Sequence, residues 1–329
     1  MSDHPYENLF SWRSLDQFVG RLEQGILFED DNIVAIDKPW GVGIHNAHVT
    51  IKKQTSYLMD TLHFGDPRFC IDDALPLLCD RLRTKKLVVG RSIDRFESGI
   101  ILLSKSDLGS KVISRISRLY KPQMIPFAKY WCITKGYPII PGNFISEQIT
   151  LKKIDVDELA DYKEPIIVTK KSFTEAFMQN HEQDFTSGRV EMHVLETNKD
   201  YAVSLVEIAT NQIKFSMVRC YAASKTSFIL GDTRFARRVR HVLGKPITLS
   251  PPSVPDDNYE PLPAPIRKRL LVPRNSAVPL MIHLRSIKIP RYGPGKTDLE
   301  ITTTQLPDHF DWSLFRLFLK QQEKKSGRK

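Results

Sequence analysis

The sequence predicts an α+β fold in which a central mixed, mostly antiparallel β-sheet is flanked by helices and long loops. Three observations support this. Short apolar, β-branched runs recur along the chain, segments with apolar residues at helical spacing lie between them, and long polar or proline-rich stretches separate the two. With 329 residues and 41% hydrophobic composition, the chain is long enough to bury a large core.

The N-terminal third begins with residues 1–22, which we expect to form a helical or irregular extension. Residues 26–46 (ILFEDDNIVAIDKPWGVGIHN) predict a strand, an acidic turn, a second strand and a Pro/Gly loop. Residues 71–83 have helical spacing and an early acidic pair, which suits a helix N-terminus. Two apolar runs surround a polar loop in residues 86–106, and residues 107–119 predict an amphipathic helix.

The remaining two thirds predict further strands, helices and two long excursions. Residues 155–190 are polar and weakly patterned, so we expect a peripheral insertion there, and the many prolines of 245–280 predict a long, partly mobile excursion. One domain is expected over 23–320, followed by a disordered basic tail over 321–329. Three strands, a mixed segment and a closing helix are expected at 130–140, 201–209, 281–289, 213–224 and 311–322.

Composition favours a polyanionic partner and offers no sign of a membrane segment. Lys and Arg number 48 against 38 for Asp and Glu, which gives a formal net charge of +10. No apolar run approaches the roughly 18 residues of a membrane span. The N-terminus has no apolar signal-peptide core and contains acidic residues, so no clear presequence is visible.

The four cysteines show no CxxC pair and no histidine at ligand spacing. We therefore expect no metal site and no disulfide framework, and free thiols suit a reducing compartment. His45 and His283 have no partner at ligand spacing and are interpreted as structural residues.

The segment from Gly90 to Gly99 places Asp94 in a polar loop between two apolar strands. Such loops commonly present reactive carboxylates, and the flanking Arg91 and Arg95 would keep Asp94 ionised and attract phosphate. The alternative is an Asp-mediated turn with two solvated arginines.

This loop resembles the motif His-Arg-Leu-Asp-x-x-Thr-Ser-Gly, followed by an apolar strand and Ala-Lys, of RluA-type pseudouridine synthases. Ile93-Asp94 stands for Leu-Asp, Ser98-Gly99 for Ser-Gly, and IILLSK for the strand. Other blocks follow in the family's order: EDDNIVAIDKPWG, AKYWCITKGYP, FSMVRCYAASKTSFILGDTRF, PLMIHLRSIKIP and LPDHF. The resemblance runs from about Ile26 to Leu319, is closest to the divergent mitochondrial members of animals, and lacks an N-terminal S4 module.

The resemblance implies a single pseudouridine synthase domain that isomerises uridine in RNA, with Asp94 as the catalytic aspartate. Tyr130 matches the active-site tyrosine on which a flipped uracil stacks, with a half-buried strand tyrosine as the alternative. Arg219 matches the late family arginine when counted back from Gly231-Asp232, and it would hold Asp94 charged. Lys214, in Gln-Ile-Lys, is the competing position.

Several residues are expected to bind the RNA. Val218 would pack against the base. Phosphate contacts are expected from Lys38, Arg91, Arg95, Arg234, Arg237 and Arg238, with Arg240, Arg267, Lys268 and Arg269 as further candidates. A solvated basic face is the ordinary alternative for any one of these cations, but FARRVRHVLGK is denser in arginine than solubility requires.

Three departures from the motif leave activity open. Ser92 stands where the family has Arg, Glu97 where it has Thr, and Tyr221 where it has His. Glu97 would raise the pKa of Asp94 by like-charge repulsion if it points inward. Two hypotheses follow: an active RNA pseudouridine synthase, or a catalytically inactive relative that binds RNA in mitochondrial RNA or ribosome assembly.

The reaction has no redox change and no group donor, so no cofactor is expected. RNA is the implied partner, with mitochondrial RNA-processing or ribosome-assembly proteins as further partners. The resemblance alone implies residence in mitochondria; since no presequence is visible, the cytoplasm is the alternative.

Overall fold

A computed structural model describes residues 4–45, 64, 67–157, 162–168, 184–249, 262–274 and 276–318. Its strands are β1 (Ile26–Glu29), β2 (Ile33–Lys38), β3 (Val88–Arg91), β4 (Ser98–Ser104), β5 (Ala128–Lys135), β6 (Phe144–Asp157), β7 (Tyr162–Val168), β8 (Phe185–Asn198), β9 (Val203–Thr210), β10 (Phe228–Ile229), β11 (Val239–Val242), β12 (Lys245–Thr248), β13 (Ile282–Ile289) and β14 (Leu299–Thr302). Its helices are α1 (Leu15–Gln24), α4 (Ile71–Arg81), α5 (Asp107–Tyr120), α7 (Met217–Ser224), α8 (Thr233–Ala236), α9 (Ala264–Arg269), the 3₁₀ turn η4 (Pro294–Lys296) and α10 (Asp308–Phe318).

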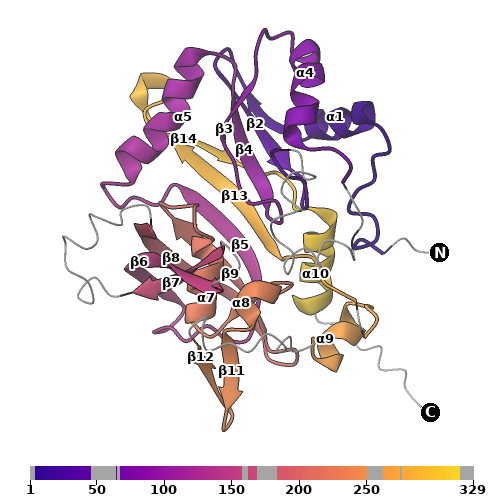
Figure 1. The fold of residues 1–329 in the computed structure, drawn as a ribbon, viewed down its shortest axis with the longest axis vertical. Coiled ribbons are helices and arrows are strands. Elements are labelled where there is room, and N and C mark those ends of the chain that lie inside the picture. Colours follow the sequence, from indigo (N-terminus) through magenta and orange to yellow (C-terminus); the bar gives the residue numbers. More distant parts are fainter. Residues whose placement is uncertain are drawn as a thin grey trace, which may run out of the picture.

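Within these residues, 12 strands form one sheet in the order β1-β2-β4-β13-β5-β9-β8-β6-β7, and β3, β10 and β14 pair at its flanks. Strands β11 and β12 form a separate hairpin, which projects from one end of the molecule (Figure 1). Strands β13 and β4 run parallel, whereas the other paired strands of the sheet are antiparallel. The predicted mixed, mostly antiparallel α+β fold is therefore confirmed.

The centre of the sheet is covered on both faces, which explains its composition. All seven residues of β4 are buried, and the run Ile100–Leu103 shows no alternation between polar and apolar residues. A strand that is buried on both faces has this continuous apolar pattern. Helix α5 lies against β3, β4 and β13, while α1 and α4 lie together beside β2 (Figure 1).

The helices begin where their capping residues predict. Ser14 accepts a hydrogen bond from the backbone N–H of Gln17 at the start of α1, and Ser106 accepts one from Gly109 at the start of α5. Helix α1 buries Phe18, Val19 and Leu22 in the same core as the sheet. Tyr6 and Trp12 are buried in that core as well, so the segment before residue 23 packs against the folded body.

The expectation of a peripheral insertion over 155–190 is wrong for the described part of that range. Residues 155–157 end β6, residues 162–168 form β7, and residues 185–190 begin β8, all paired in the main sheet. Their polar composition reflects the position of β7, which among the described strands is the last of the sheet order and pairs on one side only. Residues 158–161 and 169–183, like the expected tail over 321–329, lie outside the described residues.

Two further segments differ in detail from the sequence expectations. The mixed segment 213–224 contains helix α7, so Arg219 lies on a helix and not on a strand. The proline-rich range 245–280 contains β12 and α9 in its described parts.

Strand β4 approaches β13 more closely than a side chain allows. Gly99 has φ +119°, and a Cβ atom built there would lie 2.4 Å from the carbonyl oxygen of Leu284. Next to it, the Ser98 hydroxyl donates to the Ile282 carbonyl at 3.2 Å and lies 3.1 Å from Nδ1 of His283. The Ser-Gly pair therefore fixes the start of β4 on β13, and with it the loop that precedes β4.

Candidate active site

Asp94 stands on the tight loop between β3 and β4 and is exposed to solvent. Its carboxylate accepts a hydrogen bond from the backbone N–H of Phe96 at 3.2 Å, and its carbonyl accepts one from Glu97 at 3.2 Å. The loop is thus an Asp-initiated turn that points its carboxylate outward. The Asp-mediated turn that was the alternative for this loop is present, and the turn also lines a cleft.

Lys38, the last residue of β2, anchors this loop. Lys38 pairs with Gly99 in the sheet, and its side chain is 0% exposed. Its ammonium group donates to the carbonyls of Pro39 at 3.1 Å, Val42 at 2.9 Å and Arg95 at 3.1 Å. These three bonds use all three donors of the ammonium.

The expectation that Lys38 contacts phosphate is therefore wrong, because its ammonium is buried and its donors are bound to backbone. Burial lowers the pKa of Lys38 to about 7, while the nearby carboxyls of Asp94 and Glu97 oppose this shift. Arg95 adds a second link between the two loops, since its Nε donates to the Gly41 carbonyl at 2.9 Å. Its guanidinium also lies 5.7 Å from the ring of Phe96.

A cleft of about 730 Å³ opens beside Asp94. Its walls come from the β3–β4 loop, helix α5, strand β6 and the loop before α7. Among the residues that line it, the charged ones are Arg91, Asp94, Glu97, Lys153, Lys214 and Arg234. Four cations surround two carboxyls, so the cleft as a whole suits an anionic ligand.

Arg91 lines the cleft from strand β3. Its guanidinium lies 4.8 Å from the centroid of the Phe127 ring, and Nη2 donates to the Ser117 hydroxyl at 2.6 Å. Burial lowers the pKa of Arg91 to about 10, which still leaves it cationic at neutral pH. It is held in place by α5 and can present charge to a ligand in the cleft.

Two side chains beneath Asp94 are buried titratable groups. Glu97 is 5% exposed, and burial followed by the charge of Asp94 raises its pKa to about 8. Tyr130, on β5 between β13 and β9, is 1% exposed, and burial followed by the charge of Glu97 raises its pKa well above the ordinary range. Tyr130 is not among the residues that line the cleft, but Asp94, Glu97 and Arg91 are close enough to affect its ionisation.

Arg219 reaches the same region from helix α7, but its bonded partner is Asp232. Nε and Nη2 donate to the two carboxylate oxygens of Asp232 at 2.8 and 2.9 Å, in a bidentate geometry. Burial opposes the charge of Arg219, but Asp232, then Asp94 and Glu97, raise its pKa above the ordinary value. The structure brings Asp94, Tyr130 and Arg219 together, with Asp232 and not Asp94 orienting the arginine.

The other residues expected at the site separate into two groups. Val218 is 3% exposed and packs in the core, away from the cleft lining. Lys214, the competing position for the late basic residue, lines the cleft, and its backbone N–H donates to the Gln212 side chain at 3.0 Å. Sequence order alone could not separate these two cations, of which Lys214 lines the cleft whereas Arg219 is buried outside its lining.

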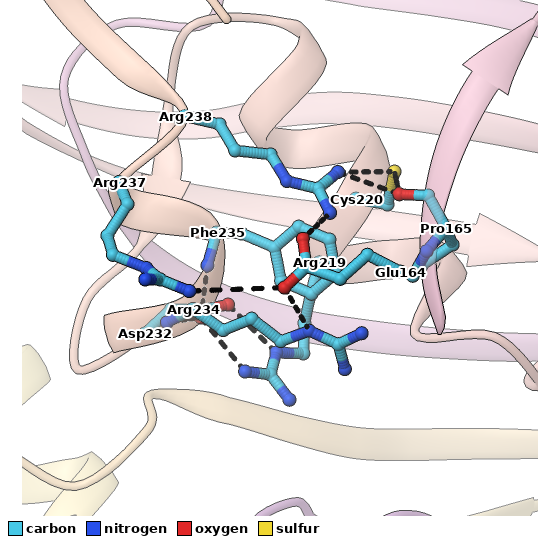
Figure 2. A network of polar contacts seen from close by, with 9 residues as sticks. All are labelled: Glu164, Pro165, Arg219, Cys220, Asp232, Arg234, Phe235, Arg237 and Arg238. Carbon is cyan, nitrogen blue, oxygen red and sulfur yellow. Dashed lines mark hydrogen bonds and ion pairs between the residues drawn. The ribbon is translucent and has the colours of Figure 1, made fainter. Parts of the chain in front are cut away.

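Three arginines in and just after helix α8 converge on one buried carboxylate, Glu164 of β7 (Figure 2). Arg234 Nε lies 3.3 Å from Oε1 and Arg237 Nη2 lies 4.0 Å from the same oxygen. Arg238 donates to Oε2 of Glu164 and, at 2.7 Å, to the carbonyl of Pro165. Since Arg238 is 4% exposed, the expectation that it contacts phosphate is wrong; Arg234 and Arg237 are partly exposed.

Sequence reasoning missed the carboxylates that hold these arginines. Asp232 was part of the quoted Gly-Asp block, and a buried arginine predicted nearby could have suggested it as a partner. Glu164 carries no such signal, because it lies in a polar segment more than fifty residues before the arginines. Lys153, whose ammonium lies 4.1 Å from the Phe215 ring centroid, was missed as well, because no local motif marks it as a cleft residue.

In the described part of the chain, no group of three or more His, Cys, Asp or Glu side chains is arranged to hold a metal ion. No helix of that part is long and apolar enough to span a membrane. His283 is buried between Ser98 and Thr303, whereas His45 is exposed and lies 2.6 Å from Asp72.

No family model matches the chain. Pseudouridylate synthase RPUSD4, mitochondrial, of Danio rerio is 24% identical over 320 residues, covering 91% of this chain and 75% of that protein. Mitochondrial mRNA pseudouridine synthase RPUSD3 of Homo sapiens is 23% identical over 333 residues, covering 98% and 84%. The solved structure of human RNA pseudouridylate synthase domain containing 4 has a TM-score of 0.63 at 19% identity, covering 93% of this chain and 97% of that chain. The expected resemblance and the fold are confirmed.

Proposed function

Because the chain resembles RluA-type pseudouridine synthases over nearly its whole length, we propose that it is an RNA pseudouridine synthase that isomerises uridine within RNA, with Asp94 as the reacting carboxylate. The observation that carries this proposal is the position of Asp94. It is an exposed carboxylate on a rigidly anchored turn, at the wall of a cleft of about 730 Å³ with a cationic lining.

The chemistry requires a group beside the ribose and base that can act as a nucleophile or a base while the link from N1 is exchanged for a link from C5. Asp94 is suited to this role because its loop is fixed by Lys38 and Arg95, which keeps the carboxylate at one place in the cleft. The isomerisation moves no electrons or groups to a second substrate. Besides the reacting carboxylate, the side chains therefore need to supply binding, orientation and proton control.

RNA would be held mainly through its phosphates. Arg91, Lys153, Lys214 and Arg234 present their charges to the cleft and are our candidates for these contacts. The target base would leave its helix or loop and enter the cleft towards Asp94. Tyr130 and Arg219 would support the floor beneath it, in agreement with their charge interactions with Asp94.

The three departures from the family motif differ in their consequences. Ser92 and Glu97 line the cleft, so they change the surface that the base meets. Tyr221, in contrast, is 0% exposed and donates to the Glu147 carboxylate at 2.6 Å, so it has a structural partner of its own. Only the first two departures therefore bear on activity.

The test is to map pseudouridine across mitochondrial and cytoplasmic RNA in cells that carry wild-type protein, Asp94→Asn or no protein. We expect specific sites to be lost in both the deletion and the Asp94→Asn cells, while the purified variant binds the same RNA like wild type. Sites that persist with Asp94→Asn would refute the role of Asp94. If no site depends on the protein, the inactive RNA-binding alternative holds instead.

We further propose that the protein works in mitochondria, because the named relatives are mitochondrial proteins. Fractionation of cells with protease protection of intact mitochondria tests this. Recovery of the native protein in the cytosolic fraction alone would refute it.

A further inference from the structure

The carboxyl group of Glu97 is buried at the wall of the cleft without a side-chain partner among the described residues. Glu97 is 5% exposed and lines the cleft together with Asp94. Its backbone N–H donates to the Asp94 carbonyl, and its carboxyl has a backbone hydrogen bond with Asp94, but no side chain among the described residues is bonded to it. A buried carboxyl needs further partners, which a ligand or water can supply.

The nearby cations do not compensate for this carboxyl. Lys38 uses its three donors on the carbonyls of Pro39, Val42 and Arg95. Arg219 donates hydrogen bonds from Nε and Nη2 to the two carboxylate oxygens of Asp232. Both cations lie close enough to favour ionisation of Glu97, yet its pKa stays at about 8, since burial and the charge of Asp94 act in the opposite direction.

The groups that face Glu97 come from every element around it. Besides the cations they include two neutral side chains on β5, whose own pKa values are raised by burial and by Glu97. The full set is Lys38 from β2, Asp94 from the loop, Tyr130 and Cys132 from β5, and Arg219 from α7. At neutral pH the carboxyl of Glu97, which lies beneath Asp94, is therefore neutral.

We infer that Glu97 donates a hydrogen bond from its carboxyl group to a carbonyl oxygen of the uracil that sits against Asp94. This inference rests on the proposed function, which supplies the base. A neutral carboxyl carries one O–H donor and an acceptor oxygen, whereas a carboxylate only accepts. Uracil presents two carbonyl oxygens, so the donor has a matching partner, and the cleft gives that partner a way in.

The contact would act during the bond exchange. When the bond between N1 and the ribose carbon breaks, its electron pair stays with the base and the negative charge spreads onto the carbonyl oxygens. The ribose carbon is then joined to C5, and the proton that C5 loses is balanced by the proton that N1 gains. A donor already placed at such an oxygen stabilises this charge more than it stabilises the neutral base. Glu97 transfers no proton in this step, and Asp94 remains the group that acts on the ribose or base.

The experiment measures turnover of RNA whose pseudouridine is lost when the gene is deleted, from pH 6 to 9.5, for wild type, Glu97→Gln and Glu97→Ala. We expect wild-type kcat to fall as the pH rises through about 8, because the donor is lost on ionisation. Glu97→Gln keeps an N–H donor at every pH, so it should be active without the alkaline decline. Glu97→Ala should lose about tenfold in kcat at pH 7 with little change in KM. Wild-type turnover in Glu97→Ala, or an unchanged alkaline decline in Glu97→Gln, would overturn the inference.

A binding measurement separates failure of this inference from failure of the proposed function. The probes are a labelled RNA stem-loop with one loop uridine and the same RNA with an abasic nucleotide at that position. If no RNA is modified by wild type, the proposed function fails, and the probes still test the contact. Glu97→Ala should weaken binding of the uridine probe only; equal effects on both probes, or none, would overturn the inference. Circular dichroism melting of each variant checks that it is folded.

Discussion

Replacing Asp232 by alanine should strongly destabilise the protein. Asp232 is 2% exposed and receives both donors of the Arg219 fork at 2.8 and 2.9 Å. Its Oδ1 also accepts the backbone N–H groups of Arg234 and Phe235 at the start of α8. The substitution leaves a buried guanidinium without a partner and removes the helix cap at the same time.

The expected loss follows from these two contributions. Breaking a buried ion pair by removing one partner typically costs about 3–5 kcal/mol, because the other charge stays buried and unpaired. Loss of an N-cap carboxylate costs about 1 kcal/mol, part of which is already counted in the first figure. We therefore expect the free energy of unfolding to fall by about 4 kcal/mol, which corresponds to roughly 8 °C in Tm for a domain of this size.

The assay is thermal and urea unfolding followed by circular dichroism, with Asp16→Ala as the matched control. Asp16 is also paired with an arginine, Arg81, but its side chain is 75% exposed. Solvent screens such a pair, so the control should melt close to wild type. A double change of Arg219→Met with Asp232→Leu should recover part of the loss, because it removes both buried charges. Equal melting of Asp232→Ala and Asp16→Ala would refute the assignment of a buried ion pair.

Three further outcomes follow from the structure. Gly99→Ala should prevent stable folding or cost about 3 kcal/mol or more, since its Cβ would collide with the β13 backbone; soluble expression and Tm check this, and a wild-type Tm would contradict it. Burial raises the pKa of Glu97 from 4.5 to about 8, so the stability that its protonated form contributes is fully present below pH 4.5 and is lost as the pH rises through about 8. The urea midpoint of unfolding should show this decline in wild type and a smaller decline in Glu97→Gln. Lys153→Ala and Lys214→Ala should each weaken RNA binding and reduce the slope of log Kd against log salt by about 1, whereas Lys199→Ala, outside the cleft lining, should not; equal slopes in all three would contradict the cleft assignment.

The fold and the position of the reactive loop could be predicted from the sequence, because both depend on the pattern of neighbouring residues. Helix α5 occupies Asp107–Tyr120 against a prediction of 107–119, and α4 occupies Ile71–Arg81 against 71–83. Periodicity and capping residues are properties of neighbouring positions, so they are readable without tertiary information. The loop of Asp94 is readable for the same reason, as a polar gap between two apolar strands.

The identity of charged partners could not be read in this way. Lys38 ends β2 immediately before a Pro/Gly loop and gives the pattern of an exposed cation, yet one of its three carbonyl partners is 57 residues away at Arg95. Arg238 belongs to a dense basic run but is neutralised by Glu164, 74 residues earlier. Whether a cation faces solvent or the interior depends on which distant backbone or carboxylate meets it, and a single sequence does not encode that in any local spacing.

The parallel pairing of β4 with β13 places a constraint on how the protein is made. His283 and Leu284 of β13 pair with Ser98 and Gly99, so one neighbour of the reactive loop's strand is synthesised about 185 residues after it. Until that part of the chain has left the ribosome, the Ser98–Gly99 end of β4 lacks this neighbour, although β2 and β3 can already pair with the rest of the strand. A chain that terminates before β13 should therefore form most of this ladder but leave the loop of Asp94 without the contacts that fix it.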